Sequence, residues 1–169
     1  VEKSIRTDEP ISGKIDYDID GKLVGNWFLE GTDGYAGDST NMERYWLGHL
    51  SIVYDAYDSD FIVLSIGNYE GEDSKQFGVK GNEPNPTEVS FENGLVVYEL
   101  VSYDYIMSNG NSWDRVSPVK NLRASSKQTV EGVVLVQMLE DRKIKFEVFP
   151  RKTASEVKTF TENAKFYER

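Results

Sequence analysis

Apolar and polar residues alternate strictly near the start of the chain. Between Ile15 and Asp20 every second residue is apolar, each of the others is an aspartate, and an apolar run follows at 23–29. Alternation with a period of two places the apolar side chains on one face of a β-strand. The Asp20-Gly21 pair between the two runs favours a two-residue turn, because glycine adopts the positive φ that such a turn needs. The pattern predicts a β-hairpin with one solvent-exposed face.

Similar apolar runs recur along the chain, separated by residues that are typical of turns, such as Asn93-Gly94. The segments expected to be strands are 11–19, 23–30, 48–55, 61–66, 76–80, 95–105, 113–116, 130–139 and 143–149. Short strands at this spacing indicate a mainly β fold, a single antiparallel β-barrel or sandwich of about eight to ten strands. We expect residues 1–169 to form one domain, in which 1–10 is a flexible N-terminal segment.

The period changes near the end of the chain. Thr153 and Glu156 have the spacing of a capping box, in which each side chain satisfies exposed backbone N–H groups at the start of a helix. Apolar residues then recur at steps of three and four, at Val157, Phe160, Ala164 and Tyr167. The pattern predicts an amphipathic α-helix over 153–168. It should pack outside the sheet against the strand at 130–139, which is apolar on both faces.

One short motif adds a resemblance to a known family. Gly25-Asn26-Trp27, in an early strand, resembles the Gly-x-Trp motif of lipocalins, which are β-barrels of the calycin group. The resemblance implies a ligand-binding cup, with Trp27 closing one end of the barrel. A strand is expected before the motif, at 11–19, where lipocalins have a short helical turn.

Charge is distributed unevenly along this acidic chain of net charge −10. Residues 1–112 carry 21 acidic and 7 basic side chains, whereas 113–169 carry 8 acidic and 12 basic side chains. The absence of Arg/Lys clusters from an anionic chain argues against nucleic-acid binding, which depends on neutralising phosphates. The basic C-terminal part is explained either by charge complementarity within one fold or by a basic face that receives an anionic ligand.

Other features limit the possible classes of protein. No apolar run approaches the ~20 residues of a membrane-spanning helix. The chain contains no Cys, which excludes disulfides, thiolate metal sites and cysteine nucleophiles. It starts at Val1, which is compatible either with a removed signal peptide or with a trimmed chain. We expect an extracytoplasmic location, either secreted or periplasmic.

The three aspartates at Asp16, Asp18 and Asp20, followed by Gly21, match the first half of an EF-hand calcium loop. The twelfth position of that loop should be a bidentate Glu, but Trp27 stands there. We therefore interpret the aspartates as the solvent face of a strand and expect no metal and no cofactor.

His49 is the only histidine, so a zinc site with several histidine ligands is excluded. It lies two residues from Ser51 on one strand face, and it could act as a general base with a carboxylate such as Asp55. Histidine and serine are also common on an ordinary solvent-exposed strand.

Aromatic residues are the candidates for lining a ligand site. They are Trp27, Tyr35, Tyr45, Trp46, Tyr54 and Trp113. The alternative interpretation is that they fill the ends of the barrel as part of the core.

Three functions remain open at this point. The first is a non-enzymatic binding protein that holds a small apolar or amphipathic ligand in the barrel, whose mouth would be ringed by the loops 31–45 and 81–90. The second is an extracytoplasmic module that recognises a protein or glycan through loop aromatics. The third is a small enzyme that uses His49. A hollow interior favours the first, and a solid interior with an aromatic patch favours the second.

Overall fold

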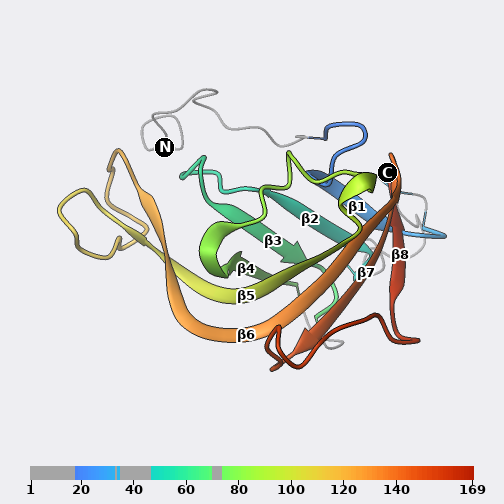
Figure 1. Cartoon of the computed structure of the whole chain (residues 1–169). Helices are drawn as coiled ribbons and strands as arrows, with labels where there is room; N and C mark the ends of the chain where they lie inside the picture. The colour runs from blue at the N-terminus through green and yellow to red at the C-terminus, as the bar shows by residue number, and fades with distance from the viewer. Residues whose placement is uncertain (1–17, 33, 35–46, 70–73) are drawn as a thin grey trace.

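The computed structural model describes residues 18–32, 34, 47–69 and 74–169. These residues form a closed barrel in which each antiparallel strand pairs with its neighbours in sequence and the last strand pairs with the first (Figure 1). The strands are β1 (Gly25–Leu29), β2 (His49–Tyr54), β3 (Ile62–Ile66), β4 (Lys75–Val79), β5 (Leu95–Ile106), β6 (Arg123–Glu140), β7 (Lys143–Pro150) and β8 (Lys165–Glu168). Short 3-10 turns lie at Lys80–Asn82 (η2) and Phe91–Asn93 (η3), between β4 and β5. The prediction of a mainly β, antiparallel barrel is confirmed.

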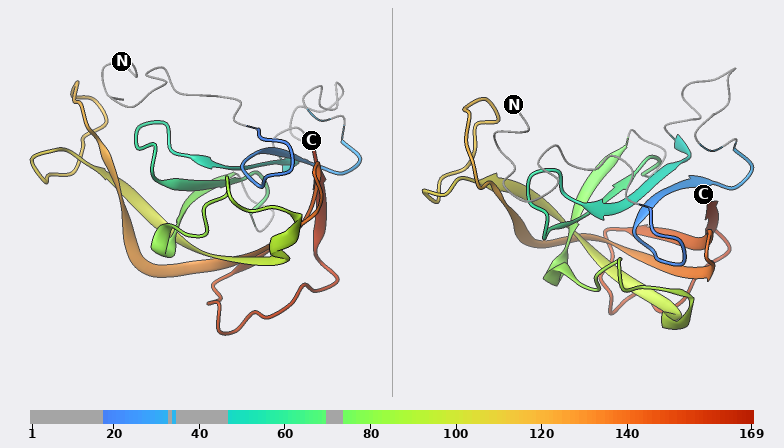
Figure 2. Two further views of the ribbon diagram at one scale, coloured as in Figure 1. Left: turned by 45° about the horizontal axis from the view of Figure 1, so that its top comes forward. Right: turned by 90° about the horizontal axis from the view of Figure 1, so that it is seen from above.

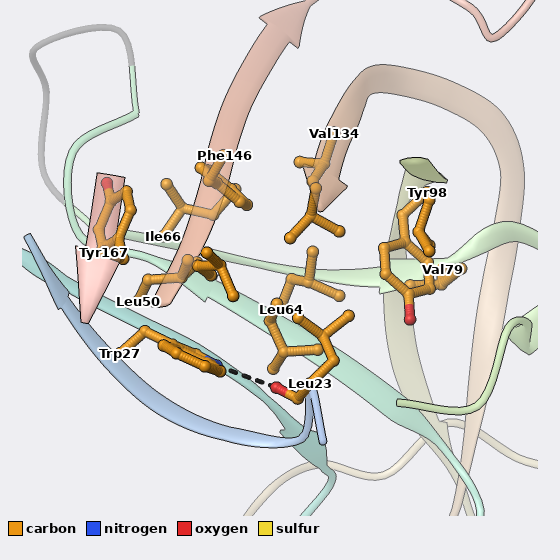
Figure 3. Close-up of a cluster of buried hydrophobic side chains, with 14 of the residues drawn as sticks. Leu23, Trp27, Leu50, Leu64, Ile66, Val79, Tyr98, Val134, Phe146 and Tyr167 are labelled. Atoms are coloured by element: carbon orange, nitrogen blue, oxygen red, sulfur yellow. Dashed lines mark hydrogen bonds between the residues drawn. The ribbon is translucent and has the colours of Figure 1, made fainter. Parts of the chain in front are cut away.

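Alternation along the strands separates the interior from the outer face. Trp27 of β1 lies opposite Leu50 of β2, which lies opposite Ile66 of β3, and all three side chains belong to one continuous core. Figure 3 shows how this core gathers side chains from strands all around the barrel. Many of these side chains, including Trp27 and Leu50, have no solvent-accessible surface. A side chain that lines a water-sized cavity would have accessible surface, so the barrel is packed solid around these fully buried side chains.

The hairpin of β5 and β6 extends beyond the barrel as an arm, formed by 103–126 (Figures 1 and 2). The register shifts between Leu100 and Tyr103, at a bulge, and β5 pairs with β4 only through Leu100 and Val101. Bulges bend a strand and increase its twist, which allows the arm to leave the barrel wall. Tyr103 then packs on Phe61, with ring centroids 5.0 Å apart.

The predicted helix at 153–168 is wrong. Residues 151–164 form an irregular connection, and Lys165–Glu168 is the strand β8 that closes the barrel. One half of the capping box forms, because the backbone N–H of Thr153 donates to the Glu156 carboxylate at 2.8 Å, but the backbone N–H of Glu156 donates to the Thr153 carbonyl and a single turn follows. Without β8, facing edges of β1 and β7 would carry unpaired backbone groups, and pairing both of them outweighs the local preference for a helix.

The C-terminal segment nevertheless packs where it was predicted to, on the outside of the sheet. Val157 and Phe160 pack on the outer face of β6, against Val133 and Leu135. The strand at 130–139 is therefore covered on both faces as expected, by an irregular connection instead of a helix.

One further strand prediction is wrong, and another falls mostly on residues that the structure does not describe. β1 pairs with β2 from Gly25 to Phe28 and with β8 at Phe28 and Leu29. Residues 18–23 form a coil and turn, and most of the predicted strand 11–19, like the segment 1–10, lies outside the described residues. Residues 113–116 are a loop at the tip of the arm. In the part of the chain that is described, no helix is long and apolar enough to cross a membrane.

Candidate ligand-binding cleft

One end of the barrel, which we call the closed end, is sealed around Trp27. The Trp27 ring is fully buried and its Nε1 donates to the carbonyl of Leu23 at 2.9 Å. The guanidinium of Arg169 lies over the ring, 4.0 Å from its centroid. The same guanidinium donates to three backbone carbonyls of the segment 19–24, at 2.6 to 2.8 Å. This end is therefore fixed by hydrogen bonds and closed to solvent.

The connection between β4 and β5 covers the closed end as well. The backbone N–H groups of Leu23 and Val24 donate to the carbonyls of Val89 and Pro86, and the hydroxyl of Tyr98 donates to the Pro84 carbonyl. The loop 81–90 therefore closes the barrel instead of ringing a mouth. The prediction that it shares a mouth with the loop 31–45 is wrong, because in an antiparallel barrel of this order β1–β2 and β4–β5 are joined at opposite ends.

A cleft of about 640 Å³ lies at the opposite end, which we call the open end. It forms where β7 and β8 separate: their pairing stops at Phe146 and Lys165, whereas β7 continues to Pro150. Phe146, Val148 and Tyr167, whose side chains belong to or pack against the barrel core, reach this cleft. Its remaining lining comes from β7, from the connection 151–164, from Lys165 at the start of β8 and from Asn68 after β3. Figure 1 shows this connection below the barrel, away from the C-terminus.

Glu147 holds one wall of the cleft in place. Its side chain is only 7% exposed, and its carboxylate accepts hydrogen bonds from both the backbone N–H and the hydroxyl of Thr161. This contact ties the connection 151–164 to β7 just beyond the last β7–β8 pair.

The cleft has an apolar floor that is closed below. Phe146 lies beside Val136, Val148 beside Val134, and Tyr167 beside Ile144, and none of these three neighbours has accessible surface. Burial raises the pKa of the Tyr167 phenol to about 12, so the floor is uncharged at neutral pH. A bound molecule would rest on these residues without entering the middle of the barrel.

The rim of the cleft is polar and carries two cations. Lys152 and Lys165 line it together with Asn68, Thr161 and Asn163. Glu147 is the one acidic residue in the lining, and its carboxylate is occupied by Thr161. An apolar floor beneath a polar, cationic rim can accommodate an amphipathic molecule.

The proposed catalytic pair is not brought together. His49 and Asp55 stand six residues apart along one strand, and six residues of β-strand span about 20 Å. His49 contacts Asn26 at 3.2 Å and the ring of Phe28, and burial lowers the pKa of its imidazole. Asp55 accepts hydrogen bonds from the hydroxyl of Tyr105, at 2.5 Å, and from two backbone N–H groups of its own loop. His49 and Asp55 therefore each take part in local packing and hydrogen bonding and do not contact each other.

Two of the aspartates that match the start of a calcium loop have other partners in the structure. Asp18 accepts from the backbone N–H of Asn26 at 2.6 Å, and Asp20 pairs with Arg142 at 3.1 Å. Asp16 lies outside the described residues. Within the described part of the chain, no group of three potential metal ligands is found.

The aromatic candidates do not form one site either. Trp27 is sealed in the closed end, and Tyr54, which packs against the core, donates its hydroxyl hydrogen bond to Asn85. Trp113 lies on the arm, where its ring is 5.6 Å from Tyr57 in a second apolar cluster. Tyr35, Tyr45 and Trp46 lie outside the described residues.

The cleft residues themselves were missed by the sequence analysis. Phe146 and Val148 were read only as members of a strand, and Tyr167 as part of a helix stripe. The basic character of 113–169 was the available signal, because Lys152 and Lys165 both belong to it.

Comparisons of the chain with protein-family models, with curated proteins and with solved structures found no match.

Proposed function

We propose that this protein is a non-enzymatic, lipocalin-like binding protein that holds a small amphipathic molecule in the cleft at the open end. The observation that carries the proposal is the separation of β7 from β8, which leaves a cleft lined by the core side chains Phe146 and Tyr167 and by Val148, which packs against the core. A volume of about 640 Å³ falls within the range of small-molecule sites, roughly 300–1,000 Å³.

The closed calycin-like barrel and the buried Trp27 support the lipocalin-like part of this proposal. The solid packing around Trp27 moves the expected ligand away from the centre of the barrel, to the open end. The aromatic cluster of the arm is a weaker basis for function, because its rings pack on one another and Trp113 Nε1 donates to Ser117 at 2.9 Å.

A fluorescence titration with the neutral dye N-phenyl-1-naphthylamine tests this function. We expect saturable binding at about one site per chain, because an apolar floor excludes water from the dye. Val148→Trp should abolish binding by filling the cleft, and Asn163→Trp, on the exposed rim, should weaken it without disturbing the core. His49→Ala should leave binding unchanged, because His49 does not line this cleft.

Val97→Trp is the matched control, since it adds the same ring to a partly exposed valine of β5 that does not line the cleft. It should retain the binding of the parent protein. The proposal would be contradicted if the parent showed no saturable binding. It would also be contradicted if folded Val148→Trp and Asn163→Trp bound the dye as tightly as the parent. Turnover of any substrate that is lost in His49→Ala would favour the enzyme instead.

A further inference from the structure

The cleft at the open end also carries information about the charge and the size of its ligand. We propose that it selects an anionic amphiphile with a short tail, whose head group is bound by Lys152 and Lys165. This inference rests on the proposed function and deepens it, because that function requires only an amphipathic ligand.

The charge of the lining supports an anionic head group. Lys152 lies on the connection 151–164 and Lys165 at the start of β8, so two different segments bring an ammonium group to the same rim. Glu147 lines the cleft with one negative charge, and Thr161 donates two hydrogen bonds to its carboxylate. Glu156, whose carboxylate accepts from Thr153, also interacts electrostatically with Lys152. The amide of Asn163 offers an uncharged donor on the same rim.

The location of these lysines is notable in a chain of net charge −10. Residues 143–165 carry six basic and three acidic side chains, and two of the basic ones, Lys152 and Lys165, line the cleft. In an otherwise anionic protein, a local cationic rim attracts an anion to this place and repels it from most others. This location gives the basic C-terminal part of the chain a specific role.

The depth of the cleft supports a short tail. The tail would lie on Phe146, Val148 and Tyr167, and their neighbours on the adjacent strand positions, Val136, Val134 and Ile144, have no accessible surface. Each methylene that becomes buried strengthens binding about fourfold, from ~0.8 kcal/mol per group. The gain in affinity per methylene should stop once the tail has covered the floor, because the core next to the floor is packed and leaves no room for a longer tail.

Calorimetric titrations with octanoate and 1-octanol test the head group. They are carried out at low salt and at ligand concentrations below micelle formation. Octanoate should bind several-fold more tightly than octanol. Lys152→Gln and Lys165→Gln should each weaken octanoate about two- to fivefold, the range expected for a partly exposed ion pair. Neither change should affect octanol, and salt should reduce the difference. Lys158→Gln is the matched control, because this exposed lysine of the same connection does not line the cleft.

A series from octanoate to tetradecanoate tests the tail, and its affinity should level off. A rise of about fourfold per methylene through the whole series would overturn the short tail. Equal binding of octanol and octanoate, or no effect of either lysine change, would overturn the anionic head group and leave the proposed function intact. Failure of both ligands to bind would refute the proposed function itself. Binding to anionic phosphatidylglycerol vesicles without binding of octanoate would overturn the assignment to a free amphiphile.

Discussion

The guanidinium of Arg169 lies 4.0 Å from the centre of the Trp27 ring and donates hydrogen bonds to the carbonyls of Ile19, Lys22 and Val24. The side chain of Arg169 is only 4% exposed. A planar cation can stack on an indole and bond several acceptors at once, which a lysine cannot do. One side chain thus joins the end of β8 to the start of β1 at the point where the barrel closes.

Arg169→Ala should lower the free energy of unfolding by about 2–4 kcal/mol, because it leaves buried carbonyls without donors and removes the cover of the Trp27 ring. Arg169→Lys should recover only part of this loss. Urea denaturation followed by tryptophan emission measures the effect.

Arg142→Ala provides the comparison. Arg142 pairs with Asp20 at 3.1 Å, but both side chains are largely exposed, so its loss should cost about 1 kcal/mol or less. Similar losses in Arg142→Ala and Arg169→Ala would show that Arg169 acts only as a surface charge.

Gly25→Ala should destabilise the protein by about 2 kcal/mol or more. Gly25 has a φ of 135°, and an added Cβ would collide with the Asp18 side chain and come within 2.7 Å of the Arg169 guanidinium. Gly94→Ala separates the two causes, because Gly94 also has a positive φ, of 64°, but open space around its Cβ position. It should show only the cost of backbone strain, about 1–2 kcal/mol. If thermal or urea unfolding showed the same loss of stability in Gly25→Ala and Gly94→Ala, the collision at Gly25 would be relieved at no cost.

Local patterns were sufficient to predict the inside of the barrel. The predicted strand segments 23–30 and 48–55 contain Leu23, Trp27, Leu50 and Ile52, and all four lie in the core. The resemblance carried by Gly25-Asn26-Trp27 implied that Trp27 closes one end of the barrel, and its ring is buried at the closed end. Period-two alternation persists whatever the rest of the chain does, so it can be read from the sequence.

Features that join distant segments could not be predicted. Arg169 and Val24 are separated by 145 positions, and no local pattern connects them. The candidate cleft depends on where the pairing of β7 with β8 stops, which is set by the geometry of closure. Thr153–Glu156 shows the limit of local signals. Half of the capping box forms and yet no helix follows, because β8 is needed to close the barrel.

Val157→Asp should cost about 2–4 kcal/mol of stability, because Val157 is buried against Val133 and Leu135 on the outer face of β6. The adjacent change Lys158→Asp should stay within about 0.5 kcal/mol, since Lys158 is exposed. A Val157→Asp protein that melts within a degree or two of the parent would show that the connection 151–164 does not pack on β6 as described.

The stability of the protein should fall as the pH rises from 10 to 12, in part because of Tyr167. Burial raises the pKa of its phenol from 10.0 to about 12, so in this window the unfolded chain loses the proton while the folded protein keeps it. The stabilisation is complete below pH 10 and is lost as the pH approaches 12. A shift of two pKa units corresponds to roughly 3 kcal/mol over the window.

Tyr167→Phe keeps the ring on the floor of the cleft and removes the titrating group. The free energy of unfolding of both proteins is measured in urea at pH 9, 10 and 11. Above pH 10 that of Tyr167→Phe should fall less steeply than that of the parent, by about 1.4 kcal/mol per pH unit. Other tyrosines and lysines titrate equally in both proteins, so the difference between the two slopes isolates Tyr167. Parallel slopes would mean that the phenol is solvated in the folded protein, and the closed, apolar floor that limits the ligand's tail would have to be abandoned.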